Sequence, residues 1–562
     1  MLVSRLWQSA QDRARPTGLL GGARLDRWTL GALVIAALAA LPILAVIIAA
    51  PSGGFGAIAH LAETILARYV INTALLMGLA GGVALVIGTL CAWLTAVADF
   101  PGKRMFEWAL VLPLAVPAYI AAYIYADLLN FTGPVQSGLR AATGLSVGEY
   151  WFPQIRSLAG GAFVLGIVLY PYVYLLARSA FKAQSARQFL AARSLGKSAC
   201  QAFFSIALPA ARPAIAGGLA LVLMEVLADF GVAQYFAIPT FSTGIFRSWL
   251  AMGDKQAALK LAAIMLIFVV LLIALERRTR KGRADSRDGQ ANAVSGAALI
   301  ELSAAQKLGA VAVCALPVLL GFVVPAAHLA LLAGEPAALS AIGDLSSYIT
   351  GSFKLGIASA LVCLMAALAL IFAQSRSNSV ITRGAIRLST LGYALPGALL
   401  AVGLLAPLGV VDVSLTRFAR DQLGYGGGLL LTGGSIILIY ALSVRFLTVA
   451  FNSLEGGVSK IPPSLDAAAR SLGAKPSQVL SRIYIPLLSP SMAAAAALVF
   501  IDTIRELPAT LILRPFNLET LATRTYRLAS DERLTEASIP ALVLLAAGLI
   551  PVMLLIRSTR KS

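Results

Sequence analysis

Charged residues are scarce in this chain: only 13% of its 562 residues are Asp, Glu, Lys or Arg, whereas 59% are hydrophobic. A water-soluble protein of this size needs a polar surface, and a mean hydropathy of +0.84 leaves too little polar material to build one. Soluble enzymes and soluble binding modules are therefore excluded. The lipid bilayer must solvate most of the chain, and it is the first partner that the sequence implies.

Histidine and cysteine are also rare, with two and four copies. His60 and His328 are isolated in the sequence, which disfavours a metal site built on histidine. The cysteines have neither metal-binding spacing nor a plausible pairing; they are Cys91, Cys200, Cys314 and Cys363. A reduced setting in the membrane or the cytoplasm fits this pattern, and any metal ligands remain unknown.

Acidic residues number 26 against 45 Lys and Arg, which gives a formal charge of +19. Such a charge would suit a nucleic-acid-binding protein, but excess Lys and Arg in a multi-pass membrane protein collect in cytoplasmic loops. We therefore expect no nucleic-acid partner. Residues 1–27 carry five arginines without the short apolar core of a signal peptide, so we expect a retained cytoplasmic N-terminal segment.

Long apolar runs divide into two sets of six on either side of a polar, basic linker at residues 276–306. The sequence predicts an all-α polytopic membrane protein with about 12 transmembrane helices, organised as units 28–275 and 307–557 with a cytoplasmic tail at 558–562. The predicted spans lie near 28–50, 70–98, 106–130, 158–180, 213–236, 257–275, 308–333, 353–373, 386–410, 428–451, 489–513 and 537–556.

One polar loop occurs in both units, at residues 185–213 and 462–490. Each copy predicts a short helix that ends at a left-handed glycine, followed by a second short helix that a proline ends. The repeated residues are Ala191, Ala192, Gly196 and Pro209 in the first copy, and Ala468, Ala469, Gly473 and Pro486 in the second. Although Gly196-Lys197-Ser198 resembles the end of a P-loop, Ala191 stands where that motif needs glycine, so we expect ATP to bind elsewhere.

The two alanines, the glycine four residues later and the I-x-[LI]-P ending resemble the EAA loop of permease subunits of bacterial ABC importers. Leu190 and Ala467 stand where that family has a glutamate. The resemblance implies two homologous six-helix permease units whose loops dock onto two copies of an ATPase subunit. It also implies a substrate-binding protein as partner, ATP on the ATPase and no cofactor in this chain, which would be a transport subunit rather than an enzyme.

Acidic residues inside predicted spans need a reason, because each costs several kcal/mol in lipid unless it is paired or faces water. Glu225 and Asp229 in the fifth span recur as Asp502 and Glu506 in the eleventh, and spacing of i, i+4 predicts one helix face for each pair. Two interpretations stay open: ion pairs that join helices, or the lining of a translocation path that meets a cation. Six tyrosines are either interfacial or packing residues or oxygen ligands of a hard metal ion: Tyr119, Tyr123 and Tyr125 in the third span and Tyr170, Tyr172 and Tyr174 in the fourth.

The stretch from Arg505 to Glu532 resembles the ferric iron importers of bacterial inner membranes, and this resemblance implies ferric iron as the substrate. Thiamine, sulfate and polyamine importers remain open as alternatives. A proton-coupled secondary transporter with 12 spans is the alternative from another class, but it would have no use for a doubled coupling loop.

The resemblance implies a bacterial inner-membrane location, and short-loop charges favour both termini in the cytoplasm. Residues 514–536 oppose this orientation, because they would be external and yet contain four arginines. Four acidic residues in the same loop balance those charges.

Overall fold

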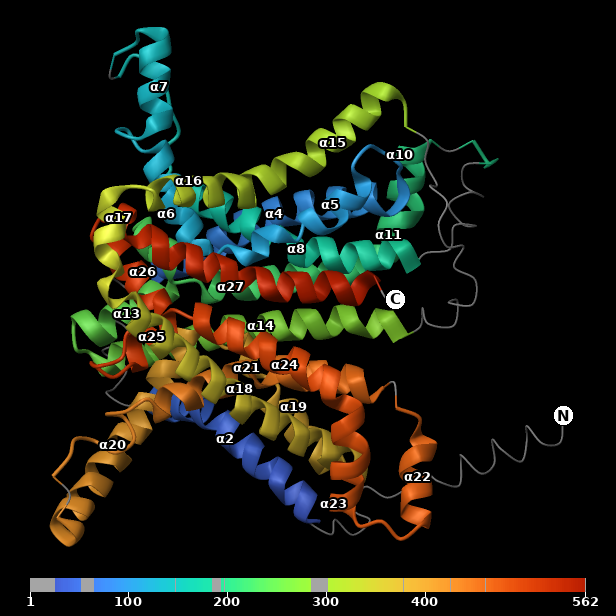
Figure 1. Cartoon of the computed structure of the whole chain (residues 1–562), viewed down its shortest axis with the longest axis vertical. Helices are drawn as coiled ribbons and strands as arrows, with labels where there is room; N and C mark the ends of the chain where they lie inside the picture. Colours follow the sequence, from blue (N-terminus) through green and yellow to red (C-terminus); the bar gives the residue numbers. More distant parts are fainter. Residues whose placement is uncertain are drawn as a thin grey trace.

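The computed structural model describes residues 26–51, 65–146, 148–183, 194–196, 198–284, 302–377, 379–424, 426–459 and 461–560. Within these ranges the regular elements are helices and there is no β-strand, so the all-α prediction is confirmed. Most of the long helices run side by side and form one bundle (Figure 1).

The first half contains α2 (Arg27–Ala49), α4 (Ala67–Val97), α5 (Lys103–Ala109), η2 (Leu112–Ala115), α6 (Ala118–Leu129), α7 (Pro134–Thr143), α8 (Leu158–Ala183), α10 (Ala199–Ala202), η3 (Phe203–Ala207), α11 (Leu208–Ala228), α12 (Gly231–Tyr235), α13 (Phe241–Phe246), η4 (Arg247–Ala251) and α14 (Lys255–Ala284).

The second half contains α15 (Ala304–Val318), η6 (Leu319–Val323), α16 (Val324–Ala333), α17 (Pro336–Ser340), η7 (Ala341–Asp344), α18 (Leu345–Arg376), α19 (Val380–Ser389), η8 (Gly392–Ala394), α20 (Gly397–Leu423), α21 (Ile436–Val458), α22 (Pro463–Ser471), α23 (Pro476–Val479), η9 (Leu480–Tyr484), α24 (Ile485–Arg505), α25 (Pro508–Leu513), α26 (Leu521–Ser530) and α27 (Leu534–Arg560).

Ten helices in the described ranges are long and apolar enough to cross a membrane, and a bent pair, Lys103–Ala115 with Ala118–Thr143, makes an eleventh candidate. The twelfth predicted span lies on α27, whose apolar stretch Leu534–Ile550 is shorter. Two ends of the bundle are distinguished below. The loop end carries α10 and α22 of the repeated loops, and the distal end carries α13, α17 and α26 (Figure 1).

Four predicted spans are interrupted helices, which corrects the simple span prediction. The third breaks at Val116-Pro117 and the ninth at Leu395-Pro396, and in both cases the residue before proline is extended, as proline sterics require. The fifth and eleventh leave helical geometry at Asp229 and Glu506, whose backbones are extended. Each half therefore contains two breaks at matching positions.

The prolines of the repeated loops do not end a helix, contrary to the prediction. Pro209 and Pro486 each lie near the start of a long helix that directly follows a π-helical turn, η3 or η9. A proline removes one donor and crowds the preceding turn, and a wide π turn relieves that crowding without stopping the helix. The second short helix of each loop therefore continues without interruption into the long helix that follows.

The first span of each half packs against the other half. Helix α2 contacts α18, α19 and α20, whereas α15 and α16 contact α4, α5 and α6. Glycine makes room inside a half: a Cβ at Gly88 would lie only 2.8 Å from the carbonyl oxygen of Tyr170, so α4 and α8 can approach closely. The crossed first spans tie the two halves into one unit.

Two cysteines mark one of these crossings. The buried thiol of Cys91 on α4 donates to the carbonyl of Val313 on α15 at 3.6 Å, next to the buried Cys314. Cys91, Cys314 and Cys363 are free thiols in the structure. Spacing along the chain gave no sign of this contact, because it joins the two halves.

This crossing predicts a cross-link between the halves. After insertion of a protease site into the linker at 276–306, iodine oxidation in the membrane should keep the two cleaved halves joined on a non-reducing gel. The substitution Cys314→Ser should release them, and Cys363→Ser should not. Separation of the oxidised wild-type halves would contradict the crossed arrangement.

Candidate functional site between the two halves

The repeated loops lie at the loop end and have the predicted turn. Gly196 and Gly473 have φ values of +82° and +78°, a left-handed conformation that favours glycine. In the second copy the amide of Ala474 donates to the carbonyl of Ala469 at 3.0 Å, which closes a Schellman motif. Leu195 and Leu472, the residues before the two glycines, are 82% and 88% exposed. Each turn therefore presents a leucine to the outside of the bundle.

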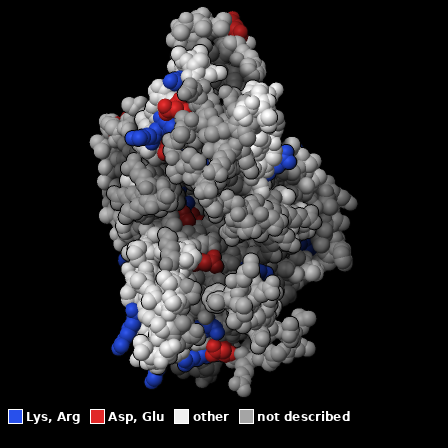
Figure 2. Space-filling model, turned by 90° about the vertical axis from the view of Figure 1, so that its right-hand side faces the viewer, with Lys and Arg blue, Asp and Glu red and all other residues white. Residues whose placement is uncertain are grey.

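Two of the predicted loop residues, Ala191 and Ala192, lie outside the described residues. Their counterparts are described: Ala468 is exposed and Ala469 is half-buried on α22. Figure 2 looks onto the loop end, where lysine and arginine side chains of the described residues are spread along the margin.

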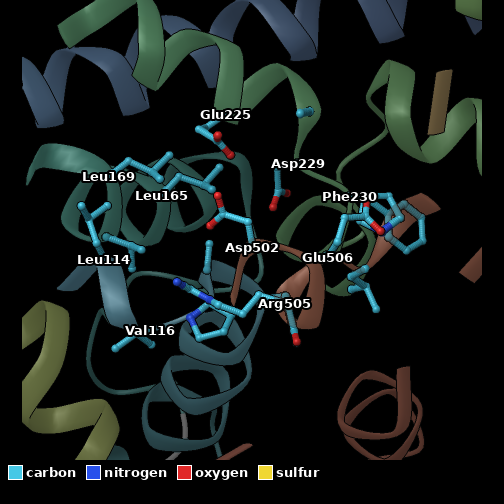
Figure 3. Close-up of a pocket in the computed structure, with 18 of the residues that line it drawn as sticks. Leu114, Val116, Leu165, Leu169, Glu225, Asp229, Phe230, Asp502, Arg505 and Glu506 are labelled. Carbon is cyan, nitrogen blue, oxygen red and sulfur yellow. The ribbon is translucent and has the colours of Figure 1, made fainter. Parts of the chain in front are cut away.

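A cavity of about 380 Å³ lies where the two halves meet. Its walls come from η2, α6, α8 and α11 of the first half and from η8, α21, α24 and α27 of the second. Figure 3 shows Glu225, Asp229, Asp502 and Glu506 around this space, so the structure brings together all four acids that the sequence singled out. The helix breaks at Pro117, Asp229 and Glu506 also line the cavity.

The two acids of each pair differ in position, which corrects the prediction of one helix face. Glu225 and Asp502 lie on α11 and α24, whereas Asp229 and Glu506 are the residues at which those helices end. Each end residue turns its carboxylate onto the short helix that follows. The Ala233 amide donates to Asp229 at 3.0 Å, and the Ala509 amide donates to Glu506 at 3.0 Å.

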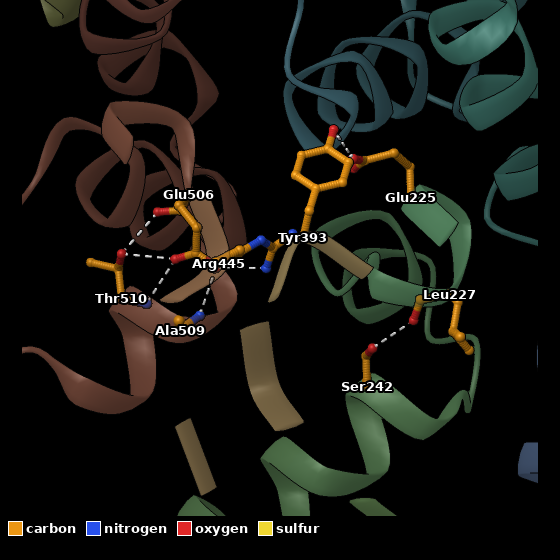
Figure 4. A network of polar contacts seen from close by, with 8 residues as sticks. All are labelled: Glu225, Leu227, Ser242, Tyr393, Arg445, Glu506, Ala509 and Thr510. Carbon is orange, nitrogen blue, oxygen red and sulfur yellow. Dashed lines mark hydrogen bonds and ion pairs between the residues drawn. The ribbon is translucent and has the colours of Figure 1, made fainter. Parts of the chain in front are cut away.

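Glu506 is held by four donor groups (Figure 4). Besides the Ala509 amide, the Thr510 amide donates to its carboxylate at 3.0 Å. The single proton of the Thr510 hydroxyl is shared between that carboxylate and the backbone carbonyl of Glu506, both 3.0 Å away. The Arg445 guanidinium on α21 approaches at 3.3 Å. Both charged side chains are buried, so the ion pair joins α21 to the break after α24 in a low-dielectric setting.

The first half lacks this ion pair. Aligning Gly160-Gly161 with Gly433-Gly434 pairs Tyr172 with Arg445, and aligning the acids pairs Ala228 with Arg505. Among the described residues, Glu225, Asp229 and Asp502 form no ion pair. The cavity is therefore built from a duplicated frame in which only the second half supplies arginines.

Sequence reasoning missed several site residues. Tyr393, just before the break in the ninth span, donates its hydroxyl to Glu225 at 3.0 Å across the two halves (Figure 4). Tyr119, which the sequence did single out, also lines the cavity, and its buried hydroxyl has no hydrogen-bond partner among the described residues. No spacing rule could connect Tyr393 or Arg445 to an acid on a distant helix.

A repeated Thr-x-x-Thr sequence could have revealed one further feature. Thr240 with Thr243 and Thr520 with Thr523 form capping boxes that begin α13 and α26. These helices are anchored to the second span of their own half, because the amide of Phe241 donates to Thr73 and that of Leu521 donates to Ser352. In both halves, therefore, a capping box and a hydrogen bond to the second span hold the chain that follows the acidic break.

The buried ion pair predicts a large asymmetry between substitutions. Arg445→Met should lower the apparent melting temperature of the purified protein by several degrees, because the isolated Glu506 charge costs about 3–5 kcal/mol. Arg445→Met/Glu506→Gln should recover part of this loss.

The exposed pair of Arg156 and Glu532, 3.7 Å apart, is the matched control, and Arg156→Met should have little effect. An Arg445→Met protein as stable as the Arg156→Met protein would contradict the assigned role of the buried pair.

Comparison with known proteins agrees with this duplicated frame. The family model described as "Binding-protein-dependent transport system inner membrane component" matches residues 84–279 and again 365–559. The Fe(3+)-transport system permease protein FbpB 2 of Haemophilus influenzae is 27% identical over 87% of this chain and 90% of its own length.

Permeases with other named substrates are also similar. The molybdenum transport system permease protein ModB of Haemophilus influenzae is 28% identical over 35% of this chain and 88% of its own length. The sulfate transport system permease protein CysT of Synechocystis is 26% identical over 46% of this chain and 91% of its own length. Because the family model covers most of both halves, this chain belongs to the inner membrane components of binding-protein-dependent transport systems, as an ABC importer permease with two permease units in one chain.

Proposed function

We propose that this ABC importer permease moves ferric iron, delivered by a substrate-binding protein, across the membrane through the cavity between its two halves. The family implies an ATPase and a substrate-binding protein as partners. The observation that carries the choice of substrate is the charge of the cavity wall. The full-length similarity to a permease named for Fe(3+) transport supports the same choice.

The charge of the cavity wall distinguishes between the substrate classes, because the volume of the cavity does not. A cavity of about 380 Å³ would hold an ion with six waters, which need roughly 180 Å³ at about 30 Å³ each, and it would also hold a small oxyanion. Four carboxylates and two arginines line it, and Arg445 is already paired with Glu506. Since Glu225, Asp229 and Asp502 have no such partner among the described residues, the wall attracts a cation and repels molybdate or sulfate.

Oxygen is also the right kind of ligand for a hard trivalent ion. Carboxylates and the free phenolic oxygen of Tyr119 are such ligands. No group of three His, Cys, Asp or Glu side chains within the described residues is placed to chelate a metal. Several separated carboxylates suit an ion in transit, since a tight binding site would hold the ion and slow its release.

The broken helices favour this cavity as the transport path. Backbone groups freed at a helix break are tolerated at membrane depth only where protein or water satisfies them. Asp229 and Glu506 satisfy amides beyond two of the breaks, and the cavity adjoins these two breaks and the one at Pro117. Transporters commonly place their substrate path at such breaks between repeated halves.

The two repeated loops supply the means of coupling. Gly196 and Gly473 shape turns that present an exposed leucine at the same end of the bundle. In this proposal each loop docks onto one ATPase subunit, so that one chain serves two ATPase copies. Closure of the ATPases on ATP then moves the halves and exposes the cavity to each side of the membrane in turn. A proton-coupled transporter would need neither loop.

The loop end and both termini face the cytoplasm in this proposal. Lys103, Arg104, Arg376, Arg383 and Arg387 lie in or beside short connections, as the positive-inside rule favours for cytoplasmic loops.

The opposing arginines at 514–536 are locally compensated. Arg514 and Arg527 lie beside Glu519, and Arg533 pairs with Glu536. With Asp531 and Glu532, residues 514–536 carry as many acidic residues as arginines.

The acids of the first half give the first test. Glu225→Gln/Asp229→Asn should reduce binding-protein-dependent uptake of radioactive ferric iron into proteoliposomes about tenfold or more, since about 1.4 kcal/mol of lost attraction suffices. ATP hydrolysis by the reconstituted complex should continue. The control is Asp421→Asn, an exposed acid on α20 that does not line the cavity.

Unchanged iron uptake by the double variant would contradict the cation path. Uptake of sulfate or molybdate by the wild type, strengthened by removal of the acids, would replace iron with an oxyanion. Thiamine and polyamines are tested as competitors in the same assay, because they too are cations.

The loop glycines give the second test. Gly196→Arg/Gly473→Arg should abolish co-purification of the ATPase with the detergent-solubilised permease, because a long side chain at each turn blocks close docking. Gly253→Arg is the matched control: Gly253 is also left-handed, with φ +66°, and open space surrounds the position of its Cβ, but it lies outside both loops. Its ATPase should co-purify as in the wild type. Retention of the ATPase by the loop variant would contradict docking at these turns.

A further inference from the structure

Two arms extend from the bundle at its distal end. The first arm, residues 131–157, contains α7 and its return segment; the second, residues 411–435, contains the outer part of α20 and its return segment. Each follows a proline break, and the arm helices end at Gly144 and Gly424, whose φ values are +69° and +65°. The arms are therefore counterparts in the two halves.

The arms leave the bundle sideways. The segment from Ala118 to Thr143 turns by 90° from the segment from Lys103 to Ala115. In Figure 1, α7 runs across the direction of the spans, α20 leaves obliquely, and the two point away from each other. Neither arm folds back over the cavity.

One face of each arm helix makes polar contacts with the return segment of the same arm. On the first arm, Tyr150 accepts from Arg140 at 2.9 Å and donates to Gln136 at 2.9 Å. On the second, buried Asp412 accepts from the amides of Leu430, Leu431 and Thr432 at 2.6–2.9 Å. Because Gln136 and Arg140 have the same i, i+4 spacing as Asp412 and Thr416, the polar faces of the two arms match.

A second face of each helix is apolar and exposed. Val135 and Leu139 form it on α7, and Trp151 on the return segment is 85% exposed. Val411, Leu415 and Phe418 form it on α20, at the i, i+4, i+7 spacing of one helix face. A third face, given by the helical period, carries Ala141 on the first arm and Arg417 on the second, and both are exposed.

From this geometry we infer that the arms lie in the membrane interface of the leaflet at the distal end, with their apolar faces against the acyl chains. The argument is continuity: α20 is one helix from the bundle to the arm tip, so its exposed apolar face extends the lipid-facing surface of a span. A helix with an apolar face, a polar face and an exposed arginine is typical of this position. Tryptophan, as at Trp151, is also typical of it.

This placement has a consequence for the cavity. The arms are connected to the breaks of the third and ninth spans: α6, which precedes the first arm, begins after Pro117, and α20 begins after Pro396. Pro117 lines the cavity wall. Lipid contact along the arms holds α6 and α20 at a fixed depth while other helices move. The inference does not depend on which substrate is carried.

The test is the accessibility of nitroxide labels on the complete ATPase complex in nanodiscs. Leu139→Cys and Phe418→Cys place labels on the apolar faces, and Ala141→Cys and Arg417→Cys place matched labels on the third faces. Power saturation should show the first two labels colliding at least about three times more with oxygen, which partitions into lipid, than with a water-soluble nickel chelate. The control labels at positions 141 and 417 should collide more with the nickel chelate than with oxygen.

Labelled complexes must keep wild-type ATP hydrolysis, and unsubstituted protein gives the background from native cysteines. Greater collision with the nickel chelate at Leu139 and Phe418 would overturn the inference. Shielding of those two labels from the chelate only after addition of the binding protein would also overturn it, and would make the arms a docking surface for that protein.

Discussion

A backbone amide or carbonyl without a partner is costly inside a membrane, and this constraint determines where the helices of this protein can break. The spans break four times, twice in each half, and three of these breaks reach the central cavity. At two of them an acidic residue ends the helix and caps the next one, as Asp229 does for Ala233 and Glu506 does for Ala509. The acids therefore satisfy backbone amides at the helix breaks, and they also add negative charge to the cavity wall.

Duplication and divergence act on different parts of the cavity. The frame is duplicated, since the proline breaks, the acids and the Thr-x-x-Thr caps of α13 and α26 recur in both halves. The charged residues are not duplicated in the same way, because the first half has Tyr172 and Ala228 where the second half has Arg445 and Arg505. Among the described residues, the second half therefore carries an acid whose ion pair joins it to α21, and the first half carries acids without an ion-pair partner. A single fused chain permits this difference, whereas two identical subunits would have identical walls.

Hydropathy and repetition were sufficient to predict the class of fold, the two halves and the position of the loop turns, because these depend on local composition. The consequences of proline were harder to predict. Pro117 and Pro396 interrupt their spans, while Pro209 and Pro486, each of which follows a π turn, do not. Gly231 and Pro508, just beyond Asp229 and Glu506, were local signs that the helices end there. The Arg445 contact and the crossing of α2 and α15 join distant segments, so no local pattern could reveal them.

The central claim is that the cavity between the halves opens to each side of the membrane in turn. The direct measurement is the labelling of Ala228→Cys, which lines the cavity, by a membrane-impermeant thiol reagent added to one side of the reconstituted complex at a time. Val226→Cys, which is buried on the same helix and does not line the cavity, is the control. The account predicts that Ala228→Cys reacts from one side without nucleotide and from the other with ATP trapped, while Val226→Cys reacts from neither. Labelling of Ala228→Cys from the same side in both states would contradict it.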